Sequence, residues 1–333
     1  MPVIKTMWRT YGACCLVLLA FLLAACARPT ETVQISPRSI AAPATPTPTA
    51  TPILSTKPLE RSAIVFQSFR NGEEAIYLMR EDGVGQTRVV RGVDPAWSPD
   101  GRRLAYSQVV DGQDMIYILE EGKPDSVPLT TGFSPVWSPD GQRLAFADRT
   151  ENSVELFLID LNGANRQRLT HNAADDLAPS WSPDGRRIVF ERNGQLILLN
   201  LSNGQETAIG TGVSIDSTPA WSPDGQWIAF ASRFQDSNRN GQIDYNDNSQ
   251  IVLTTTDGQT RVPLTDFSPV EGKPVWAQNP AWSPDGSQLA FESNRDGQWD
   301  IWIMGRDGGN ARNLTSAVQG TVNLNPRWLP GRR

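Results

Sequence analysis

The pentapeptide Trp-Ser-Pro-Asp-Gly occurs five times in this chain of 333 residues, and a shortened copy, Trp-Leu-Pro-Gly, begins at Trp328. The full copies begin at Trp97, Trp137, Trp181, Trp221 and Trp282, so the six copies are spaced by 40, 44, 40, 61 and 46 residues. Self-similarity at such a period is typical of a repeat architecture in which each repeat is one supersecondary unit. This repeat restricts the possible folds more than any other feature of the sequence.

Each repeat predicts four strands. A proline lies two residues before every Trp, and an apolar stretch such as "RLAFA" at 143 follows the pentapeptide. A second apolar stretch ("VELFLI" at 154), a hairpin signal such as Asn162-Gly163 and a short segment ("RQRLT" at 166) complete the unit. Alternating apolar stretches that are joined by Asn-Gly or Asp-Gly pairs indicate antiparallel hairpins.

The order of the strands predicts a closed ring. Three strands (63–68, 75–79 and 87–90) come before the first Pro-x-Trp strand, and the last such strand, 326–329, has nothing after it. These leftovers together make one complete four-stranded unit. A β-propeller closes in this way because pairing its two chain ends leaves no open sheet edge. We therefore expect an all-β fold, a six-bladed β-propeller closed by pairing of the N-terminal strands with the C-terminal strand.

The pentapeptide itself is explained by this architecture. Ser-Pro-Asp-Gly fits a type I turn, since Pro sets φ at the second position and Gly suits the fourth. The Trp side chain supplies a large flat surface for packing between blades. The same turn chemistry accounts for the five repeated carboxylates, which are Asp100, Asp140, Asp184, Asp224 and Asp285.

The repeat P-x-W-S-P-D-G followed by an apolar strand resembles that of the TolB-like propeller family over roughly residues 62–331. The resemblance implies a protein-interaction or envelope-component-binding scaffold without catalytic activity. It also implies an envelope partner, such as a peptidoglycan-associated lipoprotein or a glycan. TolB itself has an α/β domain before its propeller, whereas this chain has a signal and a linker there.

The N-terminal segment resembles a bacterial lipoprotein signal. Lys5 and Arg9 precede an apolar run, and "LAAC" ends it at Cys26. That run is too short to span a bilayer comfortably. We expect a signal peptide (1–25), a lipidated Cys26 with a Pro/Thr/Ala-rich linker (26–58) and the propeller (59–333). An extracytoplasmic protein, in the periplasm or at the cell surface, would then be held on a membrane through its lipid alone. The alternative is an ordinary secretory signal cut near Ala25.

Charge and cysteine content limit the function further. Removing Lys5 and Arg9 lowers the number of basic residues from 30 to 28, against 36 acidic residues. An acidic surface argues against nucleic-acid binding. All three Cys residues fall within the first 26 positions, so the predicted propeller has no disulfide.

One insertion predicts a calcium site. The segment "DSNRNGQIDYND" follows the second strand of the Trp221 repeat and matches the spacing of an EF-hand loop, with Gly241 at position 6. It resembles the dockerin-type variant, which also ends in Asp, although strands rather than helices flank it. We expect a structural calcium ion with ligands from Asp236, Asn238, Asn240, Gln242, Asp244 and Asp247. A polar surface loop is the alternative.

The same topology predicts a rim at one mouth of the channel, on the face that carries the calcium loop. The residue before the proline of each Pro-x-Trp strand would point to this mouth: Asp94, Ser134, Ala178, Thr218, Asn279 and Asn325. Acidic and aromatic residues of the neighbouring loops could join them, namely Asp175, Asp176, Asp216, Phe234, Phe267, Trp276 and Trp299. The alternative is a solvated rim with a few packing aromatics.

Catalytic motifs are absent from the sequence. His171 is the single histidine, and no G-x-S-x-G segment exists for a Ser-His-Asp hydrolase. The expected function is therefore a non-enzymatic scaffold. The alternative is an enzyme or lectin that acts on an envelope polysaccharide through a carboxylate pair in the channel mouth.

Overall fold

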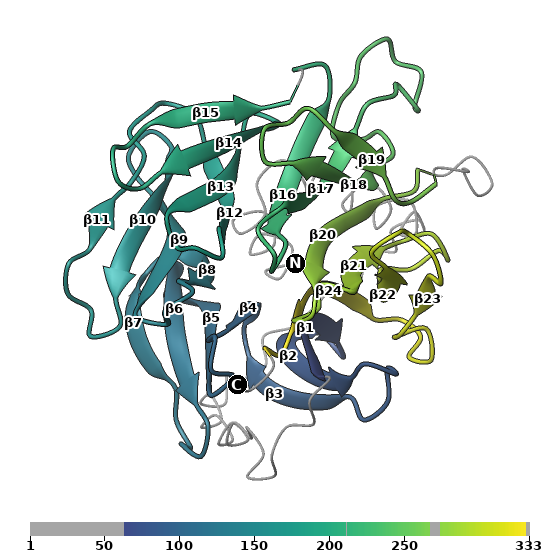
Figure 1. Ribbon diagram of the computed structural model, residues 1–333. Coiled ribbons are helices and arrows are strands. Elements are labelled where there is room, and N and C mark those ends of the chain that lie inside the picture. The colour runs from purple at the N-terminus through teal and green to yellow at the C-terminus, as the bar shows by residue number, and fades with distance from the viewer. Residues whose placement is uncertain (1–62, 211, 267–273, 331–333) are drawn as a thin grey trace, which may run out of the picture. The chain divides into compact units, whose positions relative to one another are not determined.

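The computed structural model describes residues 63–210, 212–266 and 274–330, all within the compact unit Pro52–Arg333. The predicted signal peptide (1–25), Cys26, the linker (26–58) and Phe267 lie outside the described residues. The described parts contain 24 strands and no helix, arranged as six four-stranded antiparallel sheets around a common centre (Figure 1). The predicted all-β, six-bladed propeller is confirmed.

The strands run from the centre outward in each blade. Blade 1 contains β24 (Val322–Trp328), β1 (Ala63–Arg70), β2 (Glu73–Arg80) and β3 (Thr87–Arg91). Blade 2 contains β4 (Val93–Trp97), β5 (Arg103–Val110), β6 (Gln113–Glu120) and β7 (Val127–Thr131). Blade 3 contains β8 (Phe133–Trp137), β9 (Arg143–Arg149), β10 (Val154–Asp160) and β11 (Gln167–Arg168).

The second half of the ring repeats this order. Blade 4 contains β12 (Asp176–Trp181), β13 (Arg187–Arg192), β14 (Gln195–Asn200) and β15 (Glu206–Ile209). Blade 5 contains β16 (Ile215–Trp221), β17 (Trp227–Arg233), β18 (Gln250–Thr255) and β19 (Arg261–Pro263). Blade 6 contains β20 (Ala277–Trp282), β21 (Gln288–Ser293), β22 (Asp300–Gly305) and β23 (Arg312–Asn313).

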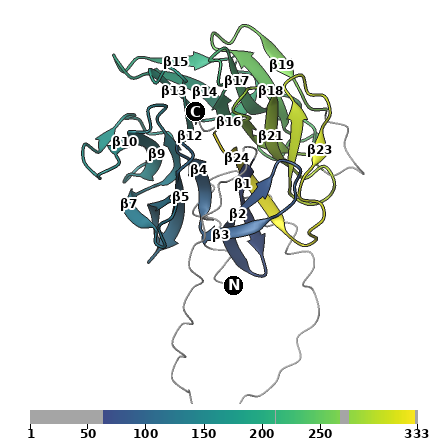
Figure 2. The ribbon, with the colours of Figure 1, turned by 60° about the horizontal axis from the view of Figure 1, so that its bottom comes forward.

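The two ends of the propeller meet in blade 1, as the strand order predicts. β24 pairs antiparallel with β1, from Ile64 opposite Trp328 to Phe69 opposite Val322. Both views of the ribbon show the yellow β24 beside the dark blue β1 (Figure 2). Because β1 then has a partner on each side, the closure completes the four-stranded sheet of blade 1.

The repeated pentapeptide forms a turn between the first and second strands of a blade. In the first copy, the Gly101 N–H donates to the Ser98 carbonyl at 2.8 Å, and Asp100 accepts from the Ser98 hydroxyl and the Arg102 N–H. Neighbouring turns pack together, since Gly141 lies beside the Pro99 ring, where a Cβ would be in ordinary van der Waals contact with the ring at 3.6 Å. The structure thus places the five repeated aspartates in turns, which agrees with the structural interpretation.

The apolar core lies between blades. One cluster, for example, joins Phe133 and Leu156 of blade 3 to Trp181 and Phe190 of blade 4. Another joins Ile64 and Trp328 of blade 1 to Ile301 of blade 6. Each blade therefore buries its two faces against its neighbours, and the ring as a whole is needed to complete the core.

Candidate functional site

The six inner strands share a backbone distortion at the residue before proline. Each of these residues has a positive φ between 50° and 52°, and the pairing with the second strand shifts register there in all six blades. A β-bulge of this kind re-aims a side chain and frees a backbone N–H from the ladder. The residues are Asp94, Ser134, Ala178, Thr218, Asn279 and Asn325.

Side chains of the preceding blade accept several of these freed N–H groups. The Ser134 N–H donates to Asp94 at 3.2 Å, the Asn279 N–H to the Thr218 hydroxyl at 3.2 Å, and the Asn325 N–H to Glu292 at 2.7 Å. The Thr218 N–H donates in the same way to Glu191. These contacts join neighbouring blades around the channel, so that the predicted mouth residues form a polar ring, which is interrupted at Ala178 because its methyl side chain has no hydrogen-bonding group.

Two carboxyl groups of this ring meet at Asn325. Its side-chain amide donates to Asp94 at 2.8 Å, while its backbone N–H holds Glu292. Both acids are buried, and this burial raises the pKa of Asp94 to about 6 and that of Glu292 to about 7. The guanidinium of Arg327 lowers both pKa values in part, and burial lowers its own pKa.

A third buried carboxyl group, Glu191, lies between blades 4 and 5. The Tyr245 hydroxyl donates to it at 3.0 Å, and burial raises the pKa of Glu191 to about 7. Tyr245 belongs to the predicted calcium loop, so this contact joins the loop to the channel ring. Neither Glu191 nor Glu292 was among the predicted site residues. Their signal in the sequence is an acid at the fifth position of an otherwise apolar strand, in "RIVFE" and "QLAFE".

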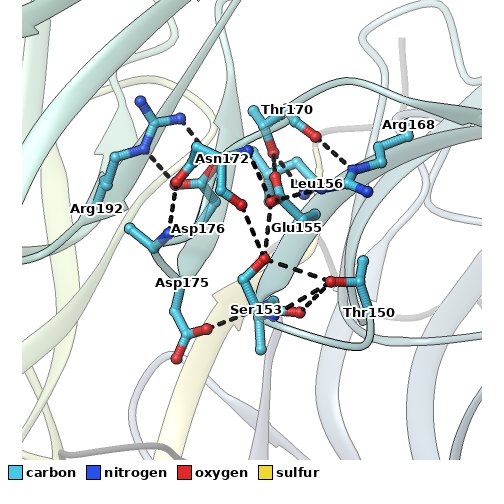
Figure 3. Close-up of polar contacts among 12 residues, drawn as sticks. Thr150, Ser153, Glu155, Leu156, Arg168, Thr170, Asn172, Asp175, Asp176 and Arg192 are labelled. Carbon is cyan, nitrogen blue, oxygen red and sulfur yellow. Dashed lines mark hydrogen bonds and ion pairs between the residues drawn. The ribbon is translucent and has the colours of Figure 1, made fainter.

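The other predicted rim acids are held in hydrogen bonds and ion pairs at the blade edges. Asp176 is fully buried and pairs with Arg192 at 2.6 Å, whereas Asp216 pairs with Arg261 at 2.9 Å. Asp175 accepts the Val154 N–H at 2.7 Å. Figure 3 shows Asp175 and Asp176 on opposite sides of their backbone, with Asp176 directed at Arg192. These three carboxylates are therefore occupied by structural contacts.

The same close-up shows a buried glutamate that ties the loop after β11 to β10 (Figure 3). Glu155 accepts hydrogen bonds from Ser153, Arg168, Thr170 and the Asn172 N–H. Burial opposes its ionisation, but these hydrogen bonds hold the pKa of Glu155 below its usual value. Because four hydrogen bonds occupy the carboxylate of Glu155, we interpret Glu155 as a residue that stabilises this loop.

The predicted rim aromatics pack together on blade 6. Trp276 is buried, stacks on Trp299 with ring centroids 5.9 Å apart, and donates its indole N–H to the Asp247 carbonyl at 2.9 Å. Phe234 is 36% exposed at the end of β17. Through this hydrogen bond the aromatic pair supports the 236–247 loop, and Trp276 is not a freely exposed platform.

The loop 236–247 is folded by its own polar side chains. Asp236 accepts the N–H groups of Asn240 and Gly241, while Asp247 is buried and accepts those of Ser237, Asn238 and Asp244. These backbone hydrogen bonds outweigh burial and keep the pKa of Asp247 below its usual value.

Two of the predicted calcium ligands donate hydrogen bonds to a third. The side-chain amide of Asn240 donates to Asp244 at 2.8 Å, and Asn238 donates to the same carboxylate at 3.4 Å. Within the described residues, no group of three His, Cys, Asp or Glu side chains is arranged to hold a metal ion. The side chains of the loop carry the carboxylate and amide oxygens that calcium prefers. The calcium site stays a prediction.

His171 lies exposed in the connection between β11 and β12. No helix in the described part of the chain is long and apolar enough to cross a membrane.

The fold and the polar ring define a class of protein. It is a closed six-bladed β-propeller in which inner-strand residues with a left-handed backbone conformation surround the channel. Residues 61–264 match the family model described as TolB beta propeller domain, which is more than half of the chain. The chain therefore belongs to the TolB beta propeller family.

Individual relatives match shorter segments of the chain. It is 36% identical over 64 residues to the Tol-Pal system protein TolB of Syntrophus aciditrophicus (strain SB), which is 19% of this chain and 14% of that protein. It is 32% identical over 87 residues to the TolB of Anaeromyxobacter dehalogenans (strain 2CP-C), covering 25% and 20%. The crystal structure of TolB from Acinetobacter baumannii superposes with a TM-score of 0.67 at 21% identity, over 81% of this chain and 67% of the other. The matched segments thus span a fifth or less of the curated relatives, and the structural likeness concerns the fold.

Proposed function

We propose that this protein is a lipid-anchored, extracytoplasmic scaffold that binds an envelope protein at the channel-mouth face of its propeller. The observation that carries this proposal is the polar ring. Five of its six residues with left-handed backbone conformation have polar side chains. Ser134, Thr218 and Asn279 of this ring are only partly buried, so they offer hydrogen-bonding groups on rigid strands, where binding loses little conformational entropy.

The engagement of the ring carboxylates favours binding over catalysis. Glu292, Glu191 and Asp94 each accept a backbone N–H of the next blade, so they hold the bulges in place. A catalytic carboxyl group must reach the reacting atoms of a substrate, and these groups are buried.

The anchor and the calcium loop complete the proposal. Lipidation of Cys26 would attach the chain to a membrane, and the segment 26–58 would separate the propeller from it. Calcium bound by the 236–247 loop would order the side of the mouth to which Tyr245 connects. The partner we expect is an envelope protein such as a peptidoglycan-associated lipoprotein.

One observation favours a second candidate, an enzyme that cleaves an envelope polysaccharide. Asp94 and Glu292 are brought together by Asn325 and have raised pKa values, as a general acid requires. Hydrolysis of envelope glycans by the wild-type protein, with loss in both Asp94→Asn and Glu292→Gln, would support this candidate.

Affinity capture tests the scaffold. The full-length protein, in detergent and with calcium, is used to capture partners from envelope extract, and mass spectrometry identifies them. A variant with Ala173→Arg on the mouth face is compared with one that carries Gln142→Arg in a turn on the opposite face; both residues are exposed. We expect a specific protein whose recovery falls only with Ala173→Arg. Equal recovery with both variants, or no specific protein at all, would contradict the proposal.

A further inference from the structure

A cavity of about 360 Å³ lies between blades 3 and 4, on the face opposite the channel mouth. Its walls are the turn between β8 and β9 and the turn between β12 and β13, which lie against each other. The side chains that line it and carry the argument are Pro139, Asp140, Arg143, Trp181, Pro183 and Asp184. This volume lies within the range of small-molecule sites in proteins.

The two aspartates each have one oxygen in the turn and one oxygen that is free. Oδ1 of Asp140 accepts from the Ser138 hydroxyl and the Gln142 N–H, and Oδ1 of Asp184 makes the equivalent contacts in its own turn. Mainly through the serine hydroxyl of each turn, the pKa of both carboxyl groups lies below its usual value. Within the described part of the chain, no hydrogen bond or ion pair reaches Oδ2 of either residue, so two ionised oxygens are open to a ligand.

The arginine of this junction leaves the cavity open. At the junction of blades 2 and 3, the guanidinium of Arg103 donates to the Gly141 carbonyl at 3.3 Å and so bridges the two turns. The guanidinium of Arg143 instead lies over the Trp181 ring, 5.8 Å from its centre. It forms no hydrogen bond with any of the described residues, and its N–H groups are therefore available as donors.

Neither sign of charge dominates around the cavity. Cations lie close to both carboxylates, namely Arg143 to Asp140, and Arg186 and Arg187 to Asp184. An ion of either sign would therefore meet groups of its own charge, which costs binding free energy. A neutral ligand avoids this repulsion, and the cavity offers it both acceptors and donors of hydrogen bonds.

We propose that this cavity binds one neutral hexopyranose unit of a glycan. The two Oδ2 atoms accept hydrogen bonds from sugar hydroxyl groups, and the Arg143 guanidinium donates to a hydroxyl or ring oxygen. The exposed rings of Pro139 and Pro183 contact the C–H groups of the sugar. The site lies away from the channel mouth, so it does not depend on the scaffold function, the anchor or calcium.

The test is a titration followed by saturation-transfer NMR on the full-length protein, in a detergent without a sugar headgroup. The probes are the uncharged methyl glycosides of glucose, galactose, mannose and N-acetylglucosamine. We expect at least one of them to bind saturably. Asp140→Asn combined with Asp184→Asn should raise its Kd at least about tenfold, because two charge-assisted hydrogen bonds are lost. In each Asn the oxygen stays with the turn, so that an NH₂ group replaces the accepting Oδ2.

The matched control carries the same change in two other turns, Asp224→Asn combined with Asp285→Asn. There Oδ2 is already engaged, by Arg306 in blade 5 and by the Ser287 hydroxyl in blade 6, so the Kd should stay that of the wild type. Arg143→Met should also weaken binding, and this variant decides the matter if the first double variant does not fold.

Three results would overturn the proposal. The first is that none of the four glycosides binds, and the second is that the two double variants bind alike. The third is that the methyl glycoside of glucuronic acid, or glucosamine, binds more tightly than every uncharged probe, since a charged ligand would then be preferred.

Discussion

Replacing Glu292 by Gln should stabilise the propeller at high pH. The carboxyl group is 4% exposed, and its pKa rises from 4.5 to about 7 on folding because burial disfavours the charged form. A raised pKa in the folded state contributes stability below the unfolded pKa, and this stability is lost as pH rises through the folded pKa. Ionised Glu292 thus lowers the free energy of unfolding by about 3 kcal/mol at pH 8, and by less than about 1 kcal/mol at pH 5.

Gln keeps a side-chain oxygen for the Asn325 N–H and cannot ionise. Urea unfolding, followed by tryptophan fluorescence, should therefore show Glu292→Gln to be more stable than the wild type by up to about 3 kcal/mol at pH 8 and nearly equal at pH 5. Glu292→Ala is the control: it leaves the Asn325 N–H without its acceptor and should destabilise at pH 5 by about 1–3 kcal/mol. A difference between Gln and wild type that does not change with pH would refute the reasoning.

Three further outcomes are expected. Cys26→Ala should move the protein from the membrane fraction to the soluble fraction in immunoblots, and its retention in the membrane would reject the lipid anchor. Calcium should raise the Tm of the wild type, whereas Asp236→Ala combined with Asp244→Ala should abolish the rise; a melting curve that ignores calcium would reject the site. Deleting 322–333 removes β24 and opens the ring, so a single unfolding transition should shift by several kcal/mol, and unchanged stability would contradict closure.

The repeat accounts for how much of the fold could be predicted. Pro-x-Trp, the turn and the apolar strands recur in register, so the blades and the pairing of β24 with β1 follow from counting. The bulge at the residue before proline could not be foreseen, because Asp94, Thr218 and Asn325 share a conformation but not a residue type.

The site was harder to predict because partners come from distant segments. Asp176 and Asp216 were predicted as rim residues, but the sequence did not show that Arg192 and Arg261 form ion pairs with them. Glu191 joins the ring through the Thr218 N–H and also contacts Tyr245, which is 54 residues away in the sequence. Asp176 and Asp216 each meet an arginine of their own blade, whereas Tyr245 belongs to a long insertion of blade 5 and reaches Glu191 of blade 4. The spacing of the repeat predicts neither kind of side-chain contact.

The most direct test of the scaffold function is photo-crosslinking in the membrane. A photoreactive amino acid is placed at Ala173, in the connection before β12 on the mouth face, or at Gln142, in the turn before β9 on the opposite face. The full-length protein is irradiated in cells, and adducts are identified by mass spectrometry. We predict one envelope protein crosslinked from position 173 and not from position 142. The same adduct from both positions, or adducts from position 142 alone, would contradict binding at the channel mouth.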